Sequence, residues 1–373
     1  MEKRRLKILV LSFYYTPDLC AGSFRAAALV KSLLNSLPSN SEIDVVTTLP
    51  NRYSSFSVDV PSIENHPGLH VCRIALPSHQ SGMIDQSKAF LTFYRQVMKH
   101  VKGRDYDLVF GTSSRLMTAV MAARVAKKKK ALLYLDIRDI FVDTIKDVLP
   151  KHLTFAIQPV FSWLENWAIN RADKVNLVSK GFGGYFKKRY PSQQFSFFTN
   201  GIDAEFLNSA RKSVQNSTGN VGLVTVLYAG NLGEGQGLHA ILPALAKKLK
   251  DQALFRVIGD GGRKKVLCRA LAEAGVENVI LLPPLNRDAL IQEYLKADVL
   301  FLHLNDYEAF KKVLPSKIFE YAAMGKPVWA GVSGYPAEFI EAEVVNSAVF
   351  EPCDVEGALA AFQRLELKDT DRL

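Results

Sequence analysis

Short apolar runs alternate with helix-like stretches along nearly the whole chain, and this alternation constrains the fold more than any other feature. A run such as Lys7–Phe13 is apolar along its length, as expected for a parallel strand covered on both faces. In the first half such runs are Lys7–Phe13, Ile43–Thr48, Leu69–Leu76, Asp107–Gly111, Ala131–Leu135 and Val175–Ser179. In the second half they are Leu223–Ala229, Phe255–Ile258, Val279–Leu282, Val299–Leu304 and Pro327–Gly331. This pattern predicts an α/β protein with doubly wound parallel sheets, in which ligands bind at the carboxyl ends of the strands.

A chain of 373 residues is long enough for two domains, each with its own core. The turn Asn200–Asp203 and the polar stretch Asn208–Gly222 separate the two series of strands. We therefore expect an N-terminal Rossmann-like domain at residues 1–205 and a second Rossmann-like domain at residues 206–355. Residues 356–373 are expected to form a terminal helix or tail, for which packing back on the N-terminal domain is one arrangement.

Positive charge is concentrated in the first half of the chain. Residues 1–205 contain 28 Lys and Arg against 17 Asp and Glu, a net charge of +11, whereas residues 206–373 contain 19 against 20, a net charge of −1. This asymmetry indicates an anionic partner for the first half, either a membrane face or a nucleic acid.

Three stretches of the first half mix basic and apolar residues, as membrane-binding helices do. Phe90–Val101 contains aromatic and basic residues, and Arg124 with Lys127–Lys130 forms a basic run. The alternative is that the apolar sides belong to the core and the lysines to solvated helix ends. A third stretch, Lys151–Arg171, contains two tryptophans, and there we favour core packing.

The chain has no signature of a secreted or membrane-spanning protein. Its four cysteines stand far apart without paired spacing, which argues against a zinc knuckle or a disulfide framework and favours a reducing cytoplasm. No segment has the roughly 18–20 consecutive apolar residues that span a bilayer. We expect a cytoplasmic protein associated peripherally with the inner face of the plasma membrane.

The stretch Leu314–Lys326 is typical of a helix start that binds an anion. Pro315 suits the first turn, Ser316 is expected to cap the free backbone N–H groups, and Lys317 adds a positive charge. Exposed N–H groups and the positive end of the helix dipole favour phosphate at such a position. Glu320 lies one turn further, where its carboxylate can accept hydrogen bonds from a sugar diol. The alternative is an ordinary capped helix.

Glycine-rich segments follow several strands. Gly230–Gly237 lies between a strand and a helix and predicts a phosphate cradle, although it matches neither the dinucleotide pattern nor the P-loop. Gly259–Gly262 follows the next strand, and Arg263 and Lys264 come directly after it. Gly22 follows the first strand and permits close approach of a ligand; a simple turn is the alternative.

Taken in order, these motifs resemble the nucleotide-sugar glycosyltransferases of the GT-B fold, specifically the large retaining family 4. The segments Tyr228–Gly237 and Asp136–Phe141 are most similar to bacterial enzymes of O-antigen or capsule assembly, including the N-acetyl-L-fucosaminyltransferases. The resemblance implies two Rossmann-like domains that face each other across a cleft, with a UDP-sugar bound to the second.

The resemblance also implies roles for particular residues. Glu320 would hold the ribose, while Ser316 and Lys317 would contact the diphosphate. Asn231 and Gln236 stand where the family commonly has arginine and lysine, which places more of the charge stabilisation on Lys317 and on Arg263 or Lys264. The implied donor-binding residues are Gly22, Gly230, Asn231, Gly233, Gln236, Gly237, Arg263, Lys264, Ser316, Lys317 and Glu320.

Asp136-Ile-Arg-Asp139 stands where the family often has a histidine. We predict that Asp139, and after it Asp136, acts near the anomeric centre, with Arg138 as an orienting partner or phosphate contact. A buried Asp–Arg ion pair that closes a loop is the alternative. A second departure is Lys312, which replaces a glutamate that often contacts the donor sugar.

The expected reaction is transfer of a sugar, with retention, from a UDP-sugar to a polyprenyl-diphosphate-linked acceptor at an anionic membrane surface. No cofactor and no catalytic metal are expected, and Asp369-Thr-Asp371 is discounted as a metal motif because it lies in a polar tail. A nucleotide-sugar epimerase of the same architecture is the alternative enzyme. A nucleic-acid-binding protein is a weaker alternative because no recognition motif is present.

Overall fold

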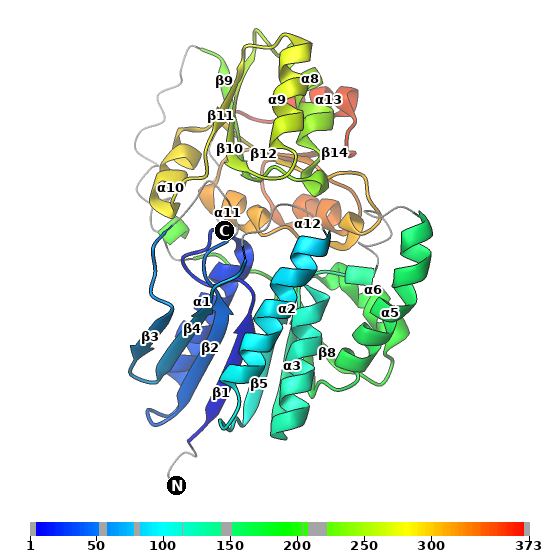
Figure 1. Cartoon of the computed structure of the whole chain (residues 1–373). Helices are drawn as coiled ribbons and strands as arrows, with labels where there is room; N and C mark the ends of the chain where they lie inside the picture. Colours follow the sequence, from blue (N-terminus) through cyan, green and yellow to red (C-terminus); the bar gives the residue numbers. More distant parts are fainter. Residues whose placement is uncertain are drawn as a thin grey trace. The chain divides into compact units, whose positions relative to one another are not determined.

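The computed structural model describes residues 5–51, 58–77, 83–113, 115–142, 151–203, 205–207 and 222–368. The chain divides into two compact units, Met1–Thr199 and Asn200–Leu373 (Figure 1). Each unit is built around its own sheet of mainly parallel strands, which confirms the predicted α/β class with two Rossmann-like domains. The Asp369–Asp371 motif and residues 208–221 of the polar stretch lie outside the described residues.

The first unit contains one 8-stranded sheet. Its strands are β1 (Lys7–Ser12), β2 (Glu42–Thr48), β3 (Ile63–His66), β4 (Leu69–Ile74), β5 (Leu108–Ser113), β6 (Leu132–Ile137), β7 (Lys174–Leu177) and β8 (Phe195–Ser196). Their order is β3-β4-β2-β1-β5-β6-β7-β8, and only β3 runs antiparallel to its neighbour. All six predicted strands are present. The two edge strands β3 and β8 were not predicted, because they are short and largely exposed or half-buried.

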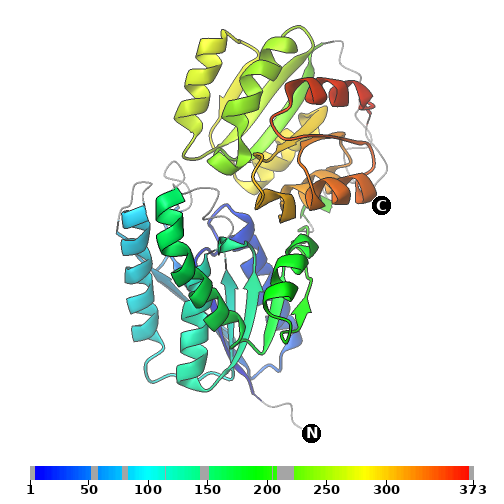
Figure 2. The same cartoon turned by 90° about the vertical axis from the view of Figure 1, so that its right-hand side faces the viewer.

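Helices cover both faces of this sheet, which explains why its central strands are apolar along their length (Figures 1 and 2). They are α1 (Ala21–Ser36), α2 (Met83–His100), α3 (Leu116–Lys129), α5 (Lys151–Ile169) and α6 (Gly183–Arg189). On one face Val30 of α1 joins a cluster with Ile8 and Val10 of β1. On the other, Phe93 of α2 packs edge-on against Phe13.

The second unit contains a 6-stranded sheet in which every pair of neighbours is parallel. Its strands are β9 (Val224–Asn231), β10 (Ala253–Asp260), β11 (Val279–Leu282), β12 (Val299–His303), β13 (Val328–Gly331) and β14 (Ser347–Phe350). Their order is β11-β10-β9-β12-β13-β14. Helices α8 (Leu238–Lys248), α9 (Lys264–Ala274) and α13 (Val355–Arg364) contribute to one core cluster. Helices α10 (Arg287–Lys296), α11 (Lys317–Met324) and α12 (Tyr335–Glu343) contribute to the cluster on the other face.

The boundary between the units lies at residues 199 and 200, earlier than the expected boundary after residue 205. Ile202 and Asp203 explain the difference, because Ile202 packs against the core of the second unit and Asp203 forms an ion pair with Arg287 of α10. The terminal helix α13 packs on the core of the second unit. Its Phe362 stacks at a tilt on Trp329, and the indole Nε1 of Trp329 donates a hydrogen bond to Ala358 O.

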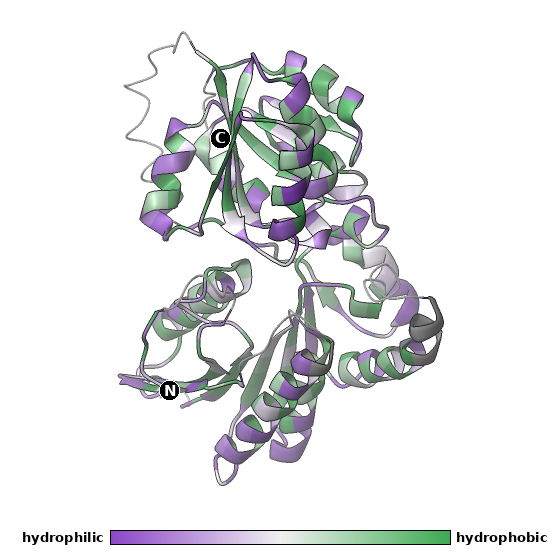
Figure 3. Cartoon of the chain, turned by 45° about the horizontal axis from the view of Figure 1, so that its top comes forward, coloured by the Kyte–Doolittle hydropathy of each residue, from purple (hydrophilic) through white to green (hydrophobic). Residues whose placement is uncertain are grey.

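The stretches considered for membrane binding differ in whether their apolar side chains are buried or exposed. In α2 the apolar stripe of Ala89, Phe93 and Val97 is buried, so the core alternative holds for that helix. In α5, where core packing was favoured, Val160 is 55% exposed and Trp163 is 64% exposed. Figure 3 shows both sheets mostly in the green of hydrophobic residues, with purple hydrophilic residues along the helices. Among the described residues no helix combines the length and apolarity that crossing a membrane requires.

Candidate functional site

The carboxyl end of β9 is the natural ligand position in the second unit. β9 is the first strand of this unit and lies between β10 and β12. From β9 the chain adds β10 and β11 on one side and then crosses over to add β12, β13 and β14 on the other. Ligands of open α/β sheets bind where the strand order reverses in this way. The segment Gly230–Gly237, here called the glycine loop, starts at this point.

The glycine loop is held by hydrogen bonds from both neighbouring strands. On the β10 side, Leu232 N donates to Asp260 O over 2.9 Å, and Arg263 N donates to Leu232 O over 2.8 Å. On the β12 side, Asn305 N donates to Gly235 O over 2.8 Å. The backbones approach so closely that a Cβ on Gly259, where φ is +151°, would lie 1.9 Å from Gly230 O. This is the physical reason for glycine at Gly259.

His303, at the end of β12, holds the glycine loop in place through its imidazole ring. Its ring lies 2.7 Å from Gln236 O through Nδ1, and its Nε2 accepts the N–H of Cys353 over 3.0 Å. Complete burial lowers the pKa of His303 to about 4, although the hydrogen bond to Gln236 O acts in the opposite direction. The ring is therefore neutral: Nδ1 carries the proton and donates to Gln236 O, and Nε2 is the acceptor.

The two polar side chains of the loop are bonded to each other. Asn231 Nδ2 donates to Gln236 Oε1 over 2.8 Å, and Gly233 N lies 3.3 Å from the same oxygen. These amides occupy the positions at which the resembled family has arginine and lysine. They stiffen the loop without adding charge, so its backbone N–H groups and neighbouring cations are left to meet an anion.

The cations after the glycine turn are not equivalent. Arg263 forms an ion pair with Glu234 of the glycine loop. Burial alone would raise the pKa of Glu234, but hydrogen bonds from Tyr307 and Arg263 lower it. Lys264, in the first turn of α9, has no ion-pair partner among the residues that the structure describes. Lys264 is thus the cation of this pair that is not already neutralised.

Helix α11 starts at the same edge of the sheet, because it connects β12 to β13. Tyr321 anchors it: its hydroxyl donates to Phe301 O over 3.2 Å and lies 3.4 Å from Ala229 N, which joins α11 to β12 and β9. Ser316 does not form the expected cap. Its φ and ψ are −61° and −24°, which are helical values, whereas a capping side chain needs an extended backbone. The hydroxyl of Ser316 is therefore not used by the helix's own N–H groups.

Lys317 and Glu320, the two charged residues predicted to bind the donor, lie together with Tyr294 of α10. Lys317 Nζ is 2.8 Å from Glu320 Oε2 and 3.0 Å from Tyr294 Oη, and Tyr294 Oη donates to Glu320 Oε2 over 2.8 Å. Burial, together with the nearby Glu320 charge, raises the pKa of Tyr294 well above its ordinary value, so its phenol stays protonated. The side chains of Lys317 and Glu320 are 23% and 13% exposed and remain reachable from solvent.

In the first unit, Asp136 lies inside β6 and not in the loop after it. Arg25 donates two hydrogen bonds to its carboxylate, each of 2.8 Å, and Asn176 Nδ2 and Thr112 Oγ1 also donate to it. Both oxygens of Asp136 are thus occupied, and the side chain is 1% exposed. This arrangement favours the alternative of a buried Asp–Arg pair, although the arginine is Arg25 and not Arg138.

Arg138 and Asp139 follow β6 directly and lie beside the start of α1. A Cβ on Gly22 would be 2.9 Å from Arg138 Nη1, so the guanidinium packs against the glycine. Nε and Nη1 of Arg138 are buried and have no hydrogen-bond partner among the described residues. Burial lowers the pKa of Arg138, while the charges of Asp136 and Asp139 act against this. Buried donors without partners next to a helix N-terminus favour an anion at this position.

Sequence reasoning missed three residues that shape these sites. Tyr294 completes the Lys317–Glu320 cluster, Arg25 neutralises Asp136, and His303 positions the glycine loop. The partners are separated by 26, 111 and 67 residues along the chain. No local sequence motif indicates contacts between residues so far apart, so these pairs are recognised only in the folded structure.

Comparison with known proteins matches each half of the chain to a family model. Residues 211–372 match the glycosyl transferases group 1, and residues 27–200 match the glycosyl transferase 4-like domain. WcaI of Escherichia coli, a protein named as a colanic acid biosynthesis glycosyl transferase, is 28% identical over 228 residues. That match covers 59% of this chain, and the chain spans about half the length of this relative, 56%.

Solved structures share the fold over nearly the whole chain. WaaG, a glycosyltransferase involved in lipopolysaccharide biosynthesis, has a TM-score of 0.68 at 16% identity and covers 96% of this chain and 90% of its own. Sucrose-phosphate synthase from Thermosynechococcus elongatus also has a TM-score of 0.68, at 14% identity, and covers 96% and 89%. HepE from Anabaena, solved with UDP-glucose, has a TM-score of 0.64 at 17% identity and covers 97% and 96%.

Proposed function

The chain belongs to the glycosyltransferases of the GT-B type, and on that premise we propose that it transfers a sugar from a UDP-sugar to a lipid-diphosphate-linked acceptor. The proposed role is in the synthesis of a bacterial surface polysaccharide. Relatives named for colanic acid and lipopolysaccharide synthesis support that setting, and HepE, solved with UDP-glucose, supports the donor class.

The cluster of Lys317, Glu320 and Tyr294 is the observation that carries the proposal. It sits at the start of α11, on the edge of the sheet where the glycine loop also lies. We assign the ribose hydroxyls to Glu320, because a carboxylate accepts two hydrogen bonds from a diol. The diphosphate then lies against Lys317 and the N–H groups of the glycine loop, where Lys317 exchanges its bond to Glu320 for the phosphate.

Charge stabilisation of the departing UDP is the step for which this chain is best equipped. The leaving diphosphate gains negative charge as the glycosidic bond to the donor breaks. Lys317, Lys264 and the backbone N–H groups of the glycine loop are fixed donors for that charge and need no reorganisation during the reaction. We propose that these groups act in place of a metal ion.

The first unit supplies the acceptor side in this proposal. Asp139 is the candidate for assisting deprotonation of the acceptor hydroxyl or for stabilising positive charge at the anomeric carbon. Arg138 offers Nε and Nη1 to a phosphate. We keep Asp136 as the residue that, together with Arg25, holds the end of β6 in place. Retention of configuration is part of the proposal and is inferred from the family resemblance.

The test is a donor panel followed by a transfer assay. Purified protein is screened against UDP-sugars by thermal shift, and the stabilising donor is then incubated with a polyprenyl-diphosphate sugar. At a donor concentration of about 100 times its Kd, binding adds about 2.7 kcal/mol to the stability of the protein. A donor that is converted in the absence of any acceptor would instead indicate an epimerase. NMR of the product's anomeric proton decides between retention and inversion.

A further inference from the structure

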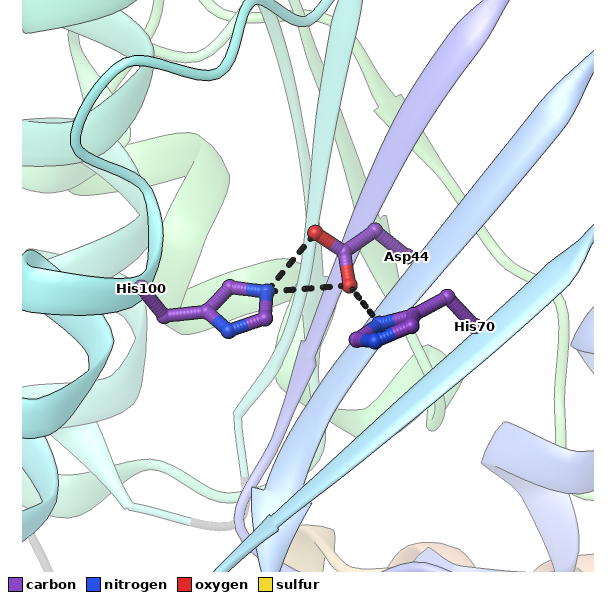
Figure 4. A group of neighbouring side chains, drawn as sticks. All are labelled: Asp44, His70 and His100. Atoms are coloured by element: carbon purple, nitrogen blue, oxygen red, sulfur yellow. Dashed lines mark hydrogen bonds and ion pairs between the residues drawn. The ribbon is translucent and has the colours of Figure 1, made fainter. Parts of the chain in front are cut away.

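A polar cluster outside the proposed reaction site lies at the amino ends of β2 and β4. Asp44 on β2 and His70 on β4 are directly opposite each other in the parallel pairing of these strands. His100 is the last residue of α2. Figure 4 shows that the three side chains, from two strands and one helix, point toward one another. The cluster therefore lies away from the carboxyl edge of this parallel sheet. Arg138 and Asp139 are at that carboxyl edge, because they follow β6.

The ligand atoms of this cluster have a spacing that suits a metal ion. His70 Nδ1 is 2.9 Å and His100 Nε2 is 3.1 Å from the same oxygen, Asp44 Oδ1. All three ligand atoms lie within 4.8 Å of one another. In a tetrahedral zinc site, bonds of about 2.0–2.2 Å place neighbouring ligand atoms roughly 3.3 Å apart. The two printed edges, 2.9 and 3.1 Å, are close to that separation, and the third, between the two imidazole nitrogens, is at most 4.8 Å.

The other oxygen of Asp44, Oδ2, lies 2.9 Å from His100 Nε2 and has two further partners. Tyr106 Oη donates to Asp44 Oδ2 over 2.5 Å, and Arg104 Nη1 donates to it over 3.1 Å. Both bonds can persist when Oδ1 binds a metal, so Arg104 need not leave. His100 is additionally hydrogen-bonded to Cys72, which fixes the orientation of its ring. Carboxylates and imidazoles held in this way are typical of metal ligands with supporting hydrogen bonds.

We propose that Asp44, His70 and His100 bind one Zn²⁺ ion through Oδ1, Nδ1 and Nε2, with water as the fourth ligand. Two imidazoles and one carboxylate are a donor set that zinc accepts readily. The ion ties the end of α2 to β2 and β4. Its role is structural, because no donor-binding or acceptor-side residue assigned above belongs to the cluster.

Without the metal, the same residues form a hydrogen-bonded ion pair. Burial alone would raise the pKa of Asp44, but hydrogen bonds from His100 and Tyr106 lower it to about 2. Burial alone would lower the pKa of His100, but the bond to Asp44 raises it to about 9. Zinc must therefore displace a proton from His100, which is why the titration is best performed above neutral pH.

The experiment is calorimetric titration of the chelator-treated full chain with ZnCl₂ at about pH 8. Wild type and a His66→Gln control, whose histidine side chain is 59% exposed and outside the cluster, are expected to bind one equivalent. His70→Asn and His100→Asn should each weaken binding more than about 100-fold, since a ligand is lost. Tyr106→Phe should weaken it about 10- to 100-fold, because it removes only a supporting hydrogen bond.

A matched measurement keeps the proposal testable if a variant is unstable. The His70 side chain is 28% exposed, so its replacement leaves the core intact, and circular dichroism checks the fold of each variant. Zinc should raise the Tm of wild type and the His66→Gln control but not of His70→Asn. Absence of zinc uptake by wild type would overturn the proposal. Uptake that is equal in wild type and His70→Asn would overturn it as well, because it would place the ion elsewhere, for example on the exposed thiol of Cys268.

Discussion

The ammonium group of Lys317 lies 2.8 Å from the carboxylate of Glu320, one turn further along α11. The hydroxyl of Tyr294 contacts both groups, so the three form a closed set of hydrogen bonds. Because the two charges are opposite and paired, the unliganded site is close to neutral. In the proposed function, donor binding separates this pair: the diphosphate contacts Lys317 and the ribose contacts Glu320. Substitutions of the two residues should therefore have different effects.

Replacing Lys317 with alanine should reduce kcat/KM for sugar transfer about 100- to 1,000-fold. In the proposed mechanism the lysine is the fixed cation that faces the charge developing on the leaving diphosphate, and loss of one such donor typically has this effect. Steady-state kinetics with the donor identified in the panel measures it. Lys296→Ala is the matched control, because Lys296 is an exposed lysine of α10 that pairs only with Glu293 in the described structure. Equal kinetics for Lys317→Ala and wild type would remove Lys317 from the mechanism.

Replacing Glu320 with glutamine should raise KM for the UDP-sugar about tenfold and leave kcat less affected. In the proposed mechanism the carboxylate binds the ribose, a part of the donor that does not react, so its loss weakens binding of the ground state and of the transition state alike. Glutamine keeps the size of the side chain and one acceptor oxygen. Tyr294→Phe separates the roles, because it removes a hydrogen-bond partner of Glu320 without changing the carboxylate. An unchanged KM for Glu320→Gln would exclude the ribose role.

Asp136→Asn should reduce the stability of the protein, whereas Asp139→Asn should reduce its activity. Asp136 accepts two hydrogen bonds from Arg25 and is buried, so its neutralisation leaves an uncompensated guanidinium and should lower the free energy of unfolding by about 3–5 kcal/mol. Asp139 is half-buried, and its variant should lose activity while keeping its stability. Urea denaturation and the transfer assay on both variants measure these effects. A stable but inactive Asp136→Asn protein would reverse the assignment.

The first unit should bind anionic vesicles through α5 and the basic residues near it. Trp163 and Val160 are exposed on α5, and α6, joined to α5 by the ion pair between Arg189 and Glu165, carries exposed Lys187 and Lys188. Apolar insertion and about 1 kcal/mol per basic residue near the surface would retain the protein. Flotation should succeed with anionic liposomes and fail with neutral ones or at high salt. Trp163→Ala should reduce it, whereas Leu91→Ala on α2 serves as the exposed apolar control.

The fold could be predicted because both sheets are covered on two faces. Burial of β1 and β9 from both sides produces apolar runs that are visible in one sequence. The docking of α13 could not be predicted in this way, since an amphipathic helix does not specify which sheet it covers. Phe362 and Ala358 meet Trp329 only in the folded second unit. The difference in the domain boundary has the same origin, because Ile202 packs on a core whose other members lie far away in the sequence.

The candidate site was predictable only where its chemistry is local. Lys317 and Glu320 are three residues apart on one helix, so their proximity follows from helical geometry. Asp136 was expected in a loop because the apolar run ends at Leu135. In fact β6 extends to Ile137, and a buried carboxylate in a strand requires a partner from another element. That partner is Arg25, and nothing in the segment around Asp136 points to it.

The second unit should lose stability as the pH falls from about 6.5 to about 4, because of His303. Its pKa is lowered to about 4 in the folded protein, while an unfolded histidine titrates near 6.5. Between these values the unfolded state binds more protons than the folded state, so the free energy of unfolding rises with pH and then levels off above about 6.5. The shift of about 2.5 pKa units corresponds to roughly 3 kcal/mol.

Hydrogen–deuterium exchange of the β12 amides at pH 4.5 and 7, after correction for intrinsic exchange rates, reports this change within the second unit. His303→Gln is the matched variant, because its amide can still donate toward Gln236 O and accept from Cys353 N but does not titrate. From pH 7 to pH 4.5, the opening free energy of wild type should therefore fall more than that of His303→Gln. If the difference were the same at both values, His303 would be charged in the folded protein, and its neutral role in holding the glycine loop would be wrong.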